Sequence, residues 1–209
     1  MDAVYKYGKG ILKDINLGNE LIWCIGNGIG GYSNHTAAGG ASMLYHGYLV
    51  ASLNPPVNRY LLFTRTQEEI EVNNKRYDLT SQQYINYNKE GNRYLEQFNF
   101  NIIPEYRYRV NDVSFKKRIS MDYGKNTVAV TYEIRNGKDE SNFKITPLFN
   151  YRLSGESMEK SKLKFNKNLQ NNLLTLIPKE NKNLKIKFFA SSGEFYDREN
   201  NEVTMVTPN

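Results

Sequence analysis

The spacing of strand-like segments and turn residues limits this chain to a fold built from sheets. Runs rich in Val, Ile, Thr, Tyr and Phe alternate with short polar stretches that favour turns. Two of these stretches, Asn73-Asn74 and Asn111-Asp112, are two-residue hairpin signals, because Asn and Asp tolerate positive φ. The sequence shows no convincing amphipathic helix and no repeat of fixed period. It therefore predicts an all-β fold, a large antiparallel β-sandwich of the supersandwich type with few or no helices.

The predicted strands recur along the chain from residue 43 to residue 197. They cover residues 43–53, 59–72, 75–79, 106–110, 113–121, 126–136, 143–152, 162–166, 172–178, 184–191 and 194–197. The run 43–53 is apolar at both parities, which predicts a strand covered on both faces. Asparagine-rich stretches at 164–172 and 179–183 lie at hairpin spacing, so we interpret them as turns and residues 1–209 as a single domain. Because residues 201–209 resemble a strand without a closing cap, we expect a larger protein to continue beyond them.

Composition narrows the class of protein and its location. Cys24 is the only cysteine, which excludes an internal disulfide and favours a reducing cytoplasm; its place beside Trp23 in a strand predicts a core position. No stretch approaches the roughly 18 consecutive apolar residues of a membrane span, and the N-terminus lacks the apolar core of a signal peptide. The lysines behind the net charge of +6 are scattered among turns, as is typical of a solvated surface. Neither nucleic acid nor a membrane is therefore predicted as a partner.

A glycine motif in the segment 20–40 raises the question of a nucleotide site. The spacing G-x-G-x-x-G is formed by Gly26, Gly28 and Gly31. A dinucleotide site also requires a helix that begins at the third glycine, a βαβ unit, and an acidic residue about 20 positions later. The glycine pair 39–40 interrupts any such helix, residues 21–67 contain no Asp or Glu, and the surrounding pattern is antiparallel. The sequence therefore predicts that this loop holds no nucleotide.

Two interpretations of the glycine-rich loop remain open. Several positions need positive φ or a close approach of the backbone to a neighbouring group. The loop is either a tight connection packed under a neighbouring strand or a backbone-rich wall that faces a ligand or a second domain. The side chains around it are those of Trp23, Asn27, Tyr32, Asn34 and His35.

Several motifs within residues 21–152 resemble one enzyme family. In chain order they are Trp23, the turn Asn27–Tyr32 (NGIGGY), Thr36 with Gly39, Tyr45-His46-Gly47, the proline link 54–56, and the runs RYLEQF (93–98), NTVAVTY (126–132) and PLFNYR (147–152). This series is similar to the opening of the bacterial and archaeal glycogen debranching enzymes, the amylo-α-1,6-glucosidases. The family usually has two arginines where this chain has Met43 and Leu44.

The resemblance implies an accessory role. In that family a β-sandwich precedes a helical (α/α) barrel, which hydrolyses the α-1,6-linked glucose at a trimmed branch point. By this resemblance the chain is a non-catalytic N-terminal domain of a glycoside hydrolase. Its expected partners are the catalytic barrel of the same parent chain and an α-glucan such as glycogen or a maltooligosaccharide.

The glycine-rich loop supplies the predicted contact surface. The candidate residues that meet the barrel or line the glucan site are Trp23, Asn27, Gly28, Gly30, Gly31, Tyr32, Tyr45 and His46. Trp23 and Tyr32 are expected to stack or pack, Asn27 and His46 to form hydrogen bonds, and the glycines to let the backbone come close.

The acidic residues do not indicate a catalytic pair. Glycoside hydrolysis needs two carboxyl groups that flank the scissile bond, whereas most acids here lie in or beside turns. We interpret Glu68, Glu69 and Glu71 as ordinary residues of an exposed strand. With His35 and His46 as the only histidines, no metal or cofactor is predicted. The chain alone is not expected to hydrolyse anything, and a free-standing carbohydrate-binding module or a purely structural, oligomerising sandwich remain alternatives.

Overall fold

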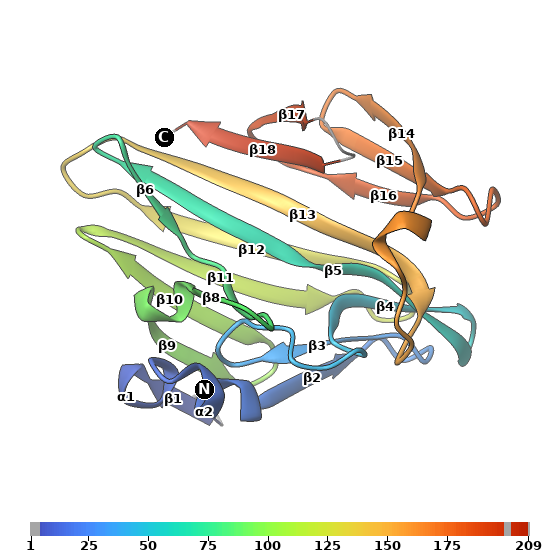
Figure 1. Ribbon diagram of the computed structural model, residues 1–209, viewed down its shortest axis with the longest axis horizontal. Helices are drawn as coiled ribbons and strands as arrows, with labels where there is room; N and C mark the ends of the chain where they lie inside the picture. Colours follow the sequence, from blue (N-terminus) through green and yellow to red (C-terminus); the bar gives the residue numbers. More distant parts are fainter. Residues whose placement is uncertain (1–4, 199–201, 209) are drawn as a thin grey trace.

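The computed structural model describes residues 5–198 and 202–208, which form mainly antiparallel strands (Figure 1). Two short helices, α1 (Lys9–Leu12) and α2 (Ile15–Glu20), lie near the N-terminus, and two 3₁₀ turns are η1 (Gly91–Tyr94) and η2 (Lys160–Lys162). The strands are β1 (Tyr5–Gly8), β2 (Ile22–Gly26), β3 (Tyr32–Thr36), β4 (Gly47–Asn54), β5 (Val57–Val72), β6 (Lys75–Asp78), β7 (Ser81–Gln83), β8 (Asn88–Glu90), β9 (Leu95–Phe100), β10 (Pro104–Val110), β11 (Val113–Met121), β12 (Val128–Arg135), β13 (Ser141–Leu153), β14 (Phe165–Gln170), β15 (Leu173–Pro178), β16 (Ile186–Phe189), β17 (Glu194–Arg198) and β18 (Glu202–Pro208).

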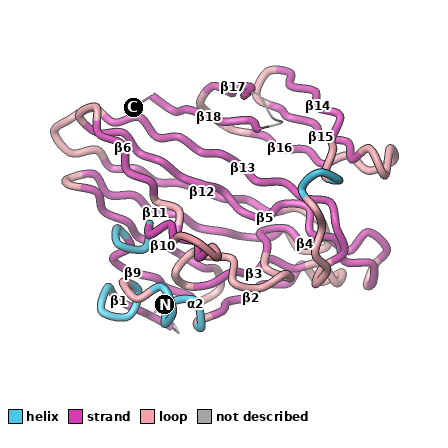
Figure 2. The backbone as a smooth tube through the Cα atoms, in the orientation of Figure 1, coloured by secondary structure: helices cyan, strands magenta, loops and turns pink. Residues whose placement is uncertain are grey.

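Two sheets make up most of the molecule. The first has the order β1-β9-β10-β11-β12, and the second has the order β17-β18-β13-β5-β4-β3-β2 with β6 paired to β5. The strands β14-β15-β16 form a small third sheet, and β7 and β8 form a separate hairpin. Figure 2 shows how little helix accompanies these strands. The prediction of an all-β, antiparallel, sandwich-like fold with few helices is confirmed.

Aromatic side chains join the two large sheets. Phe143 of the second sheet lies 5.4 Å from Phe115 and 5.2 Å from Tyr132 of the first, measured between ring centroids. At the other end of the interface the Trp23 indole N–H donates to the Tyr106 hydroxyl at 2.5 Å, and that hydroxyl donates to the carbonyl of Thr36 at 2.7 Å. These contacts bury large apolar area and satisfy the polar atoms that enter the core with it.

The asparagine turns adopt the predicted geometry. Asn73 and Asn74 have φ values of 51° and 60° between β5 and β6, and Asn111 has a φ of 54° between β10 and β11. Because both residues at the first turn lie in the left-handed region, the turn follows the right-handed twist of its strands. Both hairpins are confirmed, and β5 runs without interruption through the predicted strand 59–72.

The strand predicted over 43–53 starts late, at Gly47. The backbone N–H of Ser42 donates to His46 Nδ1 at 3.2 Å, and the His46 N–H donates to the Met43 carbonyl at 3.1 Å. This side-chain bond closes a turn that competes with the strand. From Gly47 to Ser52 every residue is buried, as predicted for a strand covered on both faces.

Cys24 does not lie in the core, so that prediction was wrong. Its thiol is exposed, because Cys24 alternates with the buried Trp23 along β2 and faces the opposite side of the strand.

The strand β9 was not among the predicted strands. Buried and partly buried residues do not alternate regularly along β9, so its sequence lacks the usual strand pattern. Its pairing with β10 is also irregular, with a register shift between Arg107 and Tyr108.

Candidate functional site

The glycine-rich loop connects two antiparallel strands, β2 and β3. The chain enters β3 directly at Tyr32, so the helix that a dinucleotide site would require does not begin at Gly31. Gly28 and Gly30 have φ values of 80° and 92°, which L side chains rarely adopt. The Asn27 side chain holds the turn, since its Oδ1 accepts from Gly31 N at 2.9 Å.

Protein atoms occupy the space that the glycines leave free. A Cβ on Gly30 would collide with the backbone of Pro56, and a Cβ on Gly28 would collide with the ring of Tyr123. A Cβ on Gly31 would lie 2.6 Å from Asn27 Nδ2 and 2.8 Å from Asn126 Oδ1. The close approach that the glycines allow is therefore an approach to neighbouring segments of the same chain.

Asn27 and Asn126 connect the two large sheets beside this loop. The Asn27 carbonyl accepts from Gly124 N at 2.7 Å, and its Nδ2 donates to Asn126 Oδ1 at 3.1 Å. Asn126 in turn exchanges two hydrogen bonds with the backbone of Ser52, at 3.1 and 2.8 Å. Because residues 124 and 126 lie in the β11–β12 turn and Ser52 lies in β4, the loop is bonded to both sheets. We call this set of contacts the asparagine clamp.

An open depression of about 360 Å³ lies next to the clamped loop. Its lining residues are Tyr32, Val57, Asn58, Arg59, Leu153 and Ser154. The Tyr32 hydroxyl shares a hydrogen bond with Ser154 Oγ at 2.8 Å and donates to the Tyr45 carbonyl at 3.3 Å. Arg59 Nε donates to the Gly30 carbonyl at 2.6 Å, which fixes this side chain against the loop. The depression thus combines one aromatic ring, two aliphatic side chains and several hydrogen-bonding groups, with no carboxylate among the lining residues.

The structure divides the predicted site residues into an exposed group and a buried group. Gly28 and Tyr45 are exposed, and Tyr32 and Gly30 are half-buried close to the depression. Trp23 is only 3% exposed, and the side chains of Asn27 and His46 are 0% and 1% exposed. Gly31 is buried as well. Tyr32, Tyr45 and Gly30 are therefore brought together at one surface, whereas Trp23, Asn27 and His46 lie behind it.

The two histidines, His35 in β3 and His46 directly before β4, form a buried pair. Their ring centroids lie 5.8 Å apart, and the ring of His35 also packs against Tyr48 at 5.2 Å. Burial lowers the pKa of His35 well below its ordinary value, and the positive charges of Arg65 and Lys117 lower it further. Burial also lowers the pKa of His46. Burial therefore favours the neutral form of both rings.

Glu68 was wrongly interpreted as a residue of an exposed strand. It is 4% exposed and accepts from Lys117 Nζ at 2.7 Å and from the Tyr132 hydroxyl at 2.6 Å. Its position two residues before Ile70, which is also buried, was the available signal, because alternate residues of a strand share a face. The carboxylate is paired and enclosed, so it cannot meet a substrate in this conformation.

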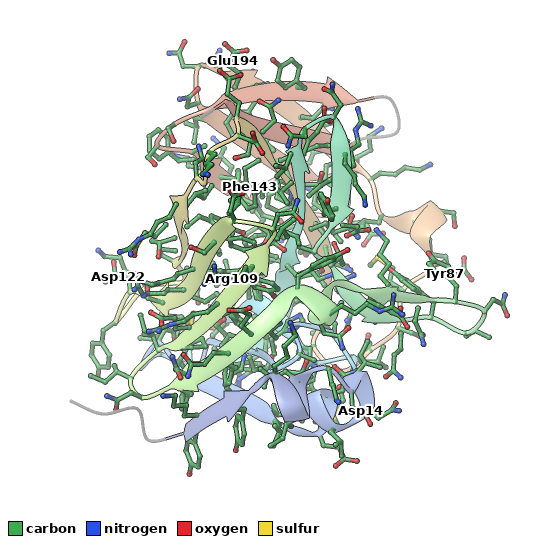
Figure 3. The ribbon with its side chains drawn as sticks, turned by 90° about the vertical axis from the view of Figure 1, so that its left-hand side faces the viewer. Asp14, Tyr87, Arg109, Asp122, Phe143 and Glu194 are labelled. Atoms are coloured by element: carbon green, nitrogen blue, oxygen red, sulfur yellow. The ribbon has the colours of Figure 1, made fainter. Side chains whose placement is uncertain are left out.

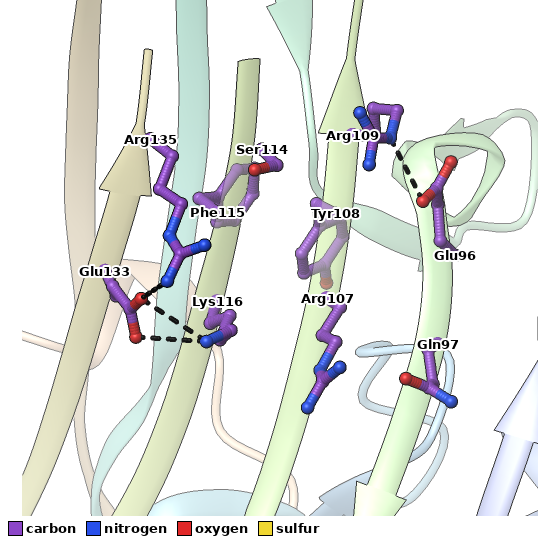
Figure 4. A pocket seen from close by; sticks show the side chains of 10 residues that line it. All are labelled: Glu96, Gln97, Arg107, Tyr108, Arg109, Ser114, Phe115, Lys116, Glu133 and Arg135. Carbon is purple, nitrogen blue, oxygen red and sulfur yellow. Dashed lines mark hydrogen bonds and ion pairs between the residues drawn. The ribbon is translucent and has the colours of Figure 1, made fainter. Parts of the chain in front are cut away.

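A second depression, of about 370 Å³, lies on the outer face of the first sheet (Figure 4). Charged side chains line it in pairs: Glu133 contacts Lys116 at 3.2 Å and Arg135 at 3.1 Å. Its two aromatic residues, Tyr108 and Phe115, are 4% and 2% exposed and offer no ring face to a ligand. Exposed ion pairs of this kind suit a solvated face better than a sugar site.

The fold and the clamped loop define a class of protein, an all-β sandwich that carries its candidate site on loops at the end of its sheets. Comparison with known families identifies the particular group. Residues 22–206 match the family described as glycogen debranching enzyme N terminal, so the chain belongs to that family. Neither the curated proteins nor the solved structures that were compared with the chain gave a match.

The longest helix among the described residues is α2, with six residues. No helix in the described part of the chain has the length and apolar character needed to cross a membrane.

Proposed function

We propose that the chain is a non-catalytic domain of an amylo-α-1,6-glucosidase, which packs on the catalytic barrel and holds an α-glucan strand at the depression beside Tyr32. The observation that carries this proposal is the depression itself, which lies next to the glycine-rich loop and shares Tyr32 with the NGIGGY turn. It is uncharged apart from Arg59 and lies next to the exposed Tyr45.

The chemistry of the lining suits a neutral sugar. Apolar C–H faces of a glucose ring pack against an aromatic or aliphatic surface, which Tyr32, Val57 and Leu153 supply. Sugar hydroxyls pair with fixed polar groups, which Asn58, Arg59 and Ser154 supply. The buried candidates act indirectly in this proposal: Asn27 holds the loop through the asparagine clamp, and Trp23 supports β2 from the core.

The reaction itself is assigned to the rest of the enzyme. Two carboxyl groups on opposite sides of the scissile bond are needed for glycoside hydrolysis. The depression beside Tyr32 has no acidic lining residue, and Glu68 is enclosed by its partners Lys117 and Tyr132. This supports a role in holding the glucan and not in cleaving it.

Calorimetric titration of the chain with maltoheptaose tests the glucan contact. We expect binding that Arg59→Gln weakens by roughly 2- to 12-fold, the range for one hydrogen bond of about 0.5–1.5 kcal/mol. Arg76→Gln is the matched control, because Arg76 is an exposed arginine of β6 that pairs with Glu71 away from the depression. Wild-type affinity in Arg59→Gln, or no binding by the wild-type chain, would contradict the glucan role and leave only packing on the barrel.

A further inference from the structure

The β7–β8 hairpin carries the most exposed apolar residue among the described large hydrophobic side chains. Ile85 is 102% exposed, and it is flanked by Tyr84 and Tyr87 at 39% and 59% exposure. The four residues 84–87 form the turn, in which the Tyr84 N–H donates to the Tyr87 carbonyl at 2.9 Å. We call these four residues the hairpin tip. Figure 3 shows that the hairpin projects from the side of the sheets, with Tyr87 near its outer end.

The base of the hairpin is held firmly. Arg65, which is 4% exposed, donates to the carbonyl of Ser81 at 3.1 Å and to the side chain of Gln82 at 2.6 Å. Gln82 also exchanges two hydrogen bonds with the backbone of Ala41, at 3.1 and 2.9 Å. Side-chain bonds from Gln83 to α2 add a third attachment. The hairpin tip is therefore presented by a preorganised support, which lowers the entropic cost of binding.

The tip is held together by a ring stack and carries no charged residue. The rings of Tyr84 and Tyr87 stack on each other with centroids 4.6 Å apart and planes 19° from parallel. The ten residues 79–88 contain no charged side chain, in a protein of which 24% of residues are charged. An apolar tip does not suit a charged partner surface. It would remove the partner's charges from water and offer no opposite charge to pair with them.

Further exposed apolar residues lie on the segment that is bonded to the base of the hairpin. Met43, Leu44 and Tyr45 are 44%, 50% and 39% exposed, and their loop is bonded to the hairpin through Ala41 and Gln82. Single exposed apolar residues are ordinary, but a group of them on adjacent segments marks an interaction surface. Large aromatic and aliphatic anchors of this type dominate the energy of protein interfaces.

We propose that the hairpin tip is a protein-docking anchor, which inserts Ile85, with the stacked pair Tyr84 and Tyr87 beside it, into an uncharged, apolar pocket on the catalytic part of the same debranching enzyme. The inference rests on the proposed function for the existence of that catalytic part, which the family description of this chain as an N-terminal region supports. A protein pocket fits better than a glucan, because the two rings face each other and the outermost group is aliphatic.

Thiol labelling in the intact enzyme tests the burial of the tip. In a Cys24→Ser background, which removes the exposed native thiol, Ile85→Cys reports on the tip. Ile102→Cys is the matched control, because Ile102 is another isoleucine in a turn and is 75% exposed. We expect Ile85→Cys to react at least tenfold more slowly in the intact enzyme than in chain 1–209, and Ile102→Cys to react equally in both.

Three outcomes would overturn the proposal. Equal labelling rates of Ile85→Cys in both proteins would show that nothing covers the tip. Protection that appears only when maltoheptaose is added would identify the tip as a glucan contact. Protection within chain 1–209 that rises with its concentration would identify a second copy as the occupant. None of these outcomes alters the Arg59→Gln titration, so failure of the docking anchor and failure of the glucan site are distinguishable.

Discussion

At the scale of single residues, the glycine-rich loop and the buried ion pair are the positions where substitution has the clearest consequence. The effect of a substitution at either place depends on atoms in direct contact with the changed side chain. For each, the chain has a second residue of the same type in a different environment, which serves as an internal control.

Gly30→Ala is expected to destabilise the protein more than Gly124→Ala. Both glycines have positive φ, 92° and 78°, so alanine is strained at each by about 1 kcal/mol. Only at Gly30 does the new Cβ also collide with backbone, that of Pro56, whereas nothing lies within 4 Å of it at Gly124. Urea unfolding should show an additional loss of about 1–3 kcal/mol for Gly30→Ala. Equal losses would mean that the Pro56 turn moves aside freely.

Lys117→Met should cost far more stability than Lys116→Met. Lys117 and Glu68 have side chains only 4% and 5% exposed, so removing the lysine leaves a buried carboxylate unpaired, at about 3–5 kcal/mol. The Lys116–Glu133 pair is 27% and 40% exposed, and its loss should cost about 1 kcal/mol or less. Chemical denaturation measures both variants. Similar values for the two lysines would show that water reaches Glu68.

At the scale of secondary-structure elements, much of the fold was predictable from local sequence. The Asn73-Asn74 and Asn111-Asp112 turns specify their hairpins, because few other residue pairs accept the required φ. The late start of β4 was not predictable in this way. It depends on a bond from Ser42 to the His46 ring, and an apolar run such as Met43–Tyr45 carries no sign of that bond.

Asn74→Gly should stabilise the β5–β6 hairpin by about 0.5–1 kcal/mol. Asn74 has a φ of 60°, which glycine adopts without the Cβ penalty that asparagine retains. Asn142→Gly, on an exposed position of β13, should instead lower stability by a similar amount, since glycine weakens a regular strand. Thermal unfolding of both variants gives the comparison. A loss of stability in Asn74→Gly would show that the asparagine side chain makes a contact essential to the turn.

At the scale of the whole molecule, the candidate site was predictable only in part. The sequence located the loop, and the structure keeps Tyr32 and Tyr45 at the surface beside it. The sequence did not predict that Trp23 is buried. It also did not predict that Val57, Arg59 and Leu153 line the depression, because this depends on how distant strands pack. Single-sequence patterns report which face of a strand is apolar, but not which loops meet at its end.

Acid should destabilise the whole domain below about pH 6.5. The folded-state pKa of His35 lies well below its ordinary value because of burial and the nearby Arg65, Lys117 and His46. The unfolded chain therefore binds more protons at mildly acidic pH, and stability falls as pH drops from the unfolded value toward the depressed folded value. His35→Phe should flatten this part of a stability-versus-pH curve measured by urea unfolding. An unchanged curve would place the acid sensitivity elsewhere.

The asparagine clamp has a consequence for local opening of the protein and for the exchange of its amide hydrogens. Because Asn27, Asn126 and Ser52 bond one loop to both sheets, the wall of the depression cannot swing outward unless the sheets themselves separate. The amide hydrogens of Gly31 and Gly124 are held by this network, so they should exchange with deuterated solvent only as fast as the entire sandwich comes apart. A glucan that binds there would meet a surface already shaped before it arrives.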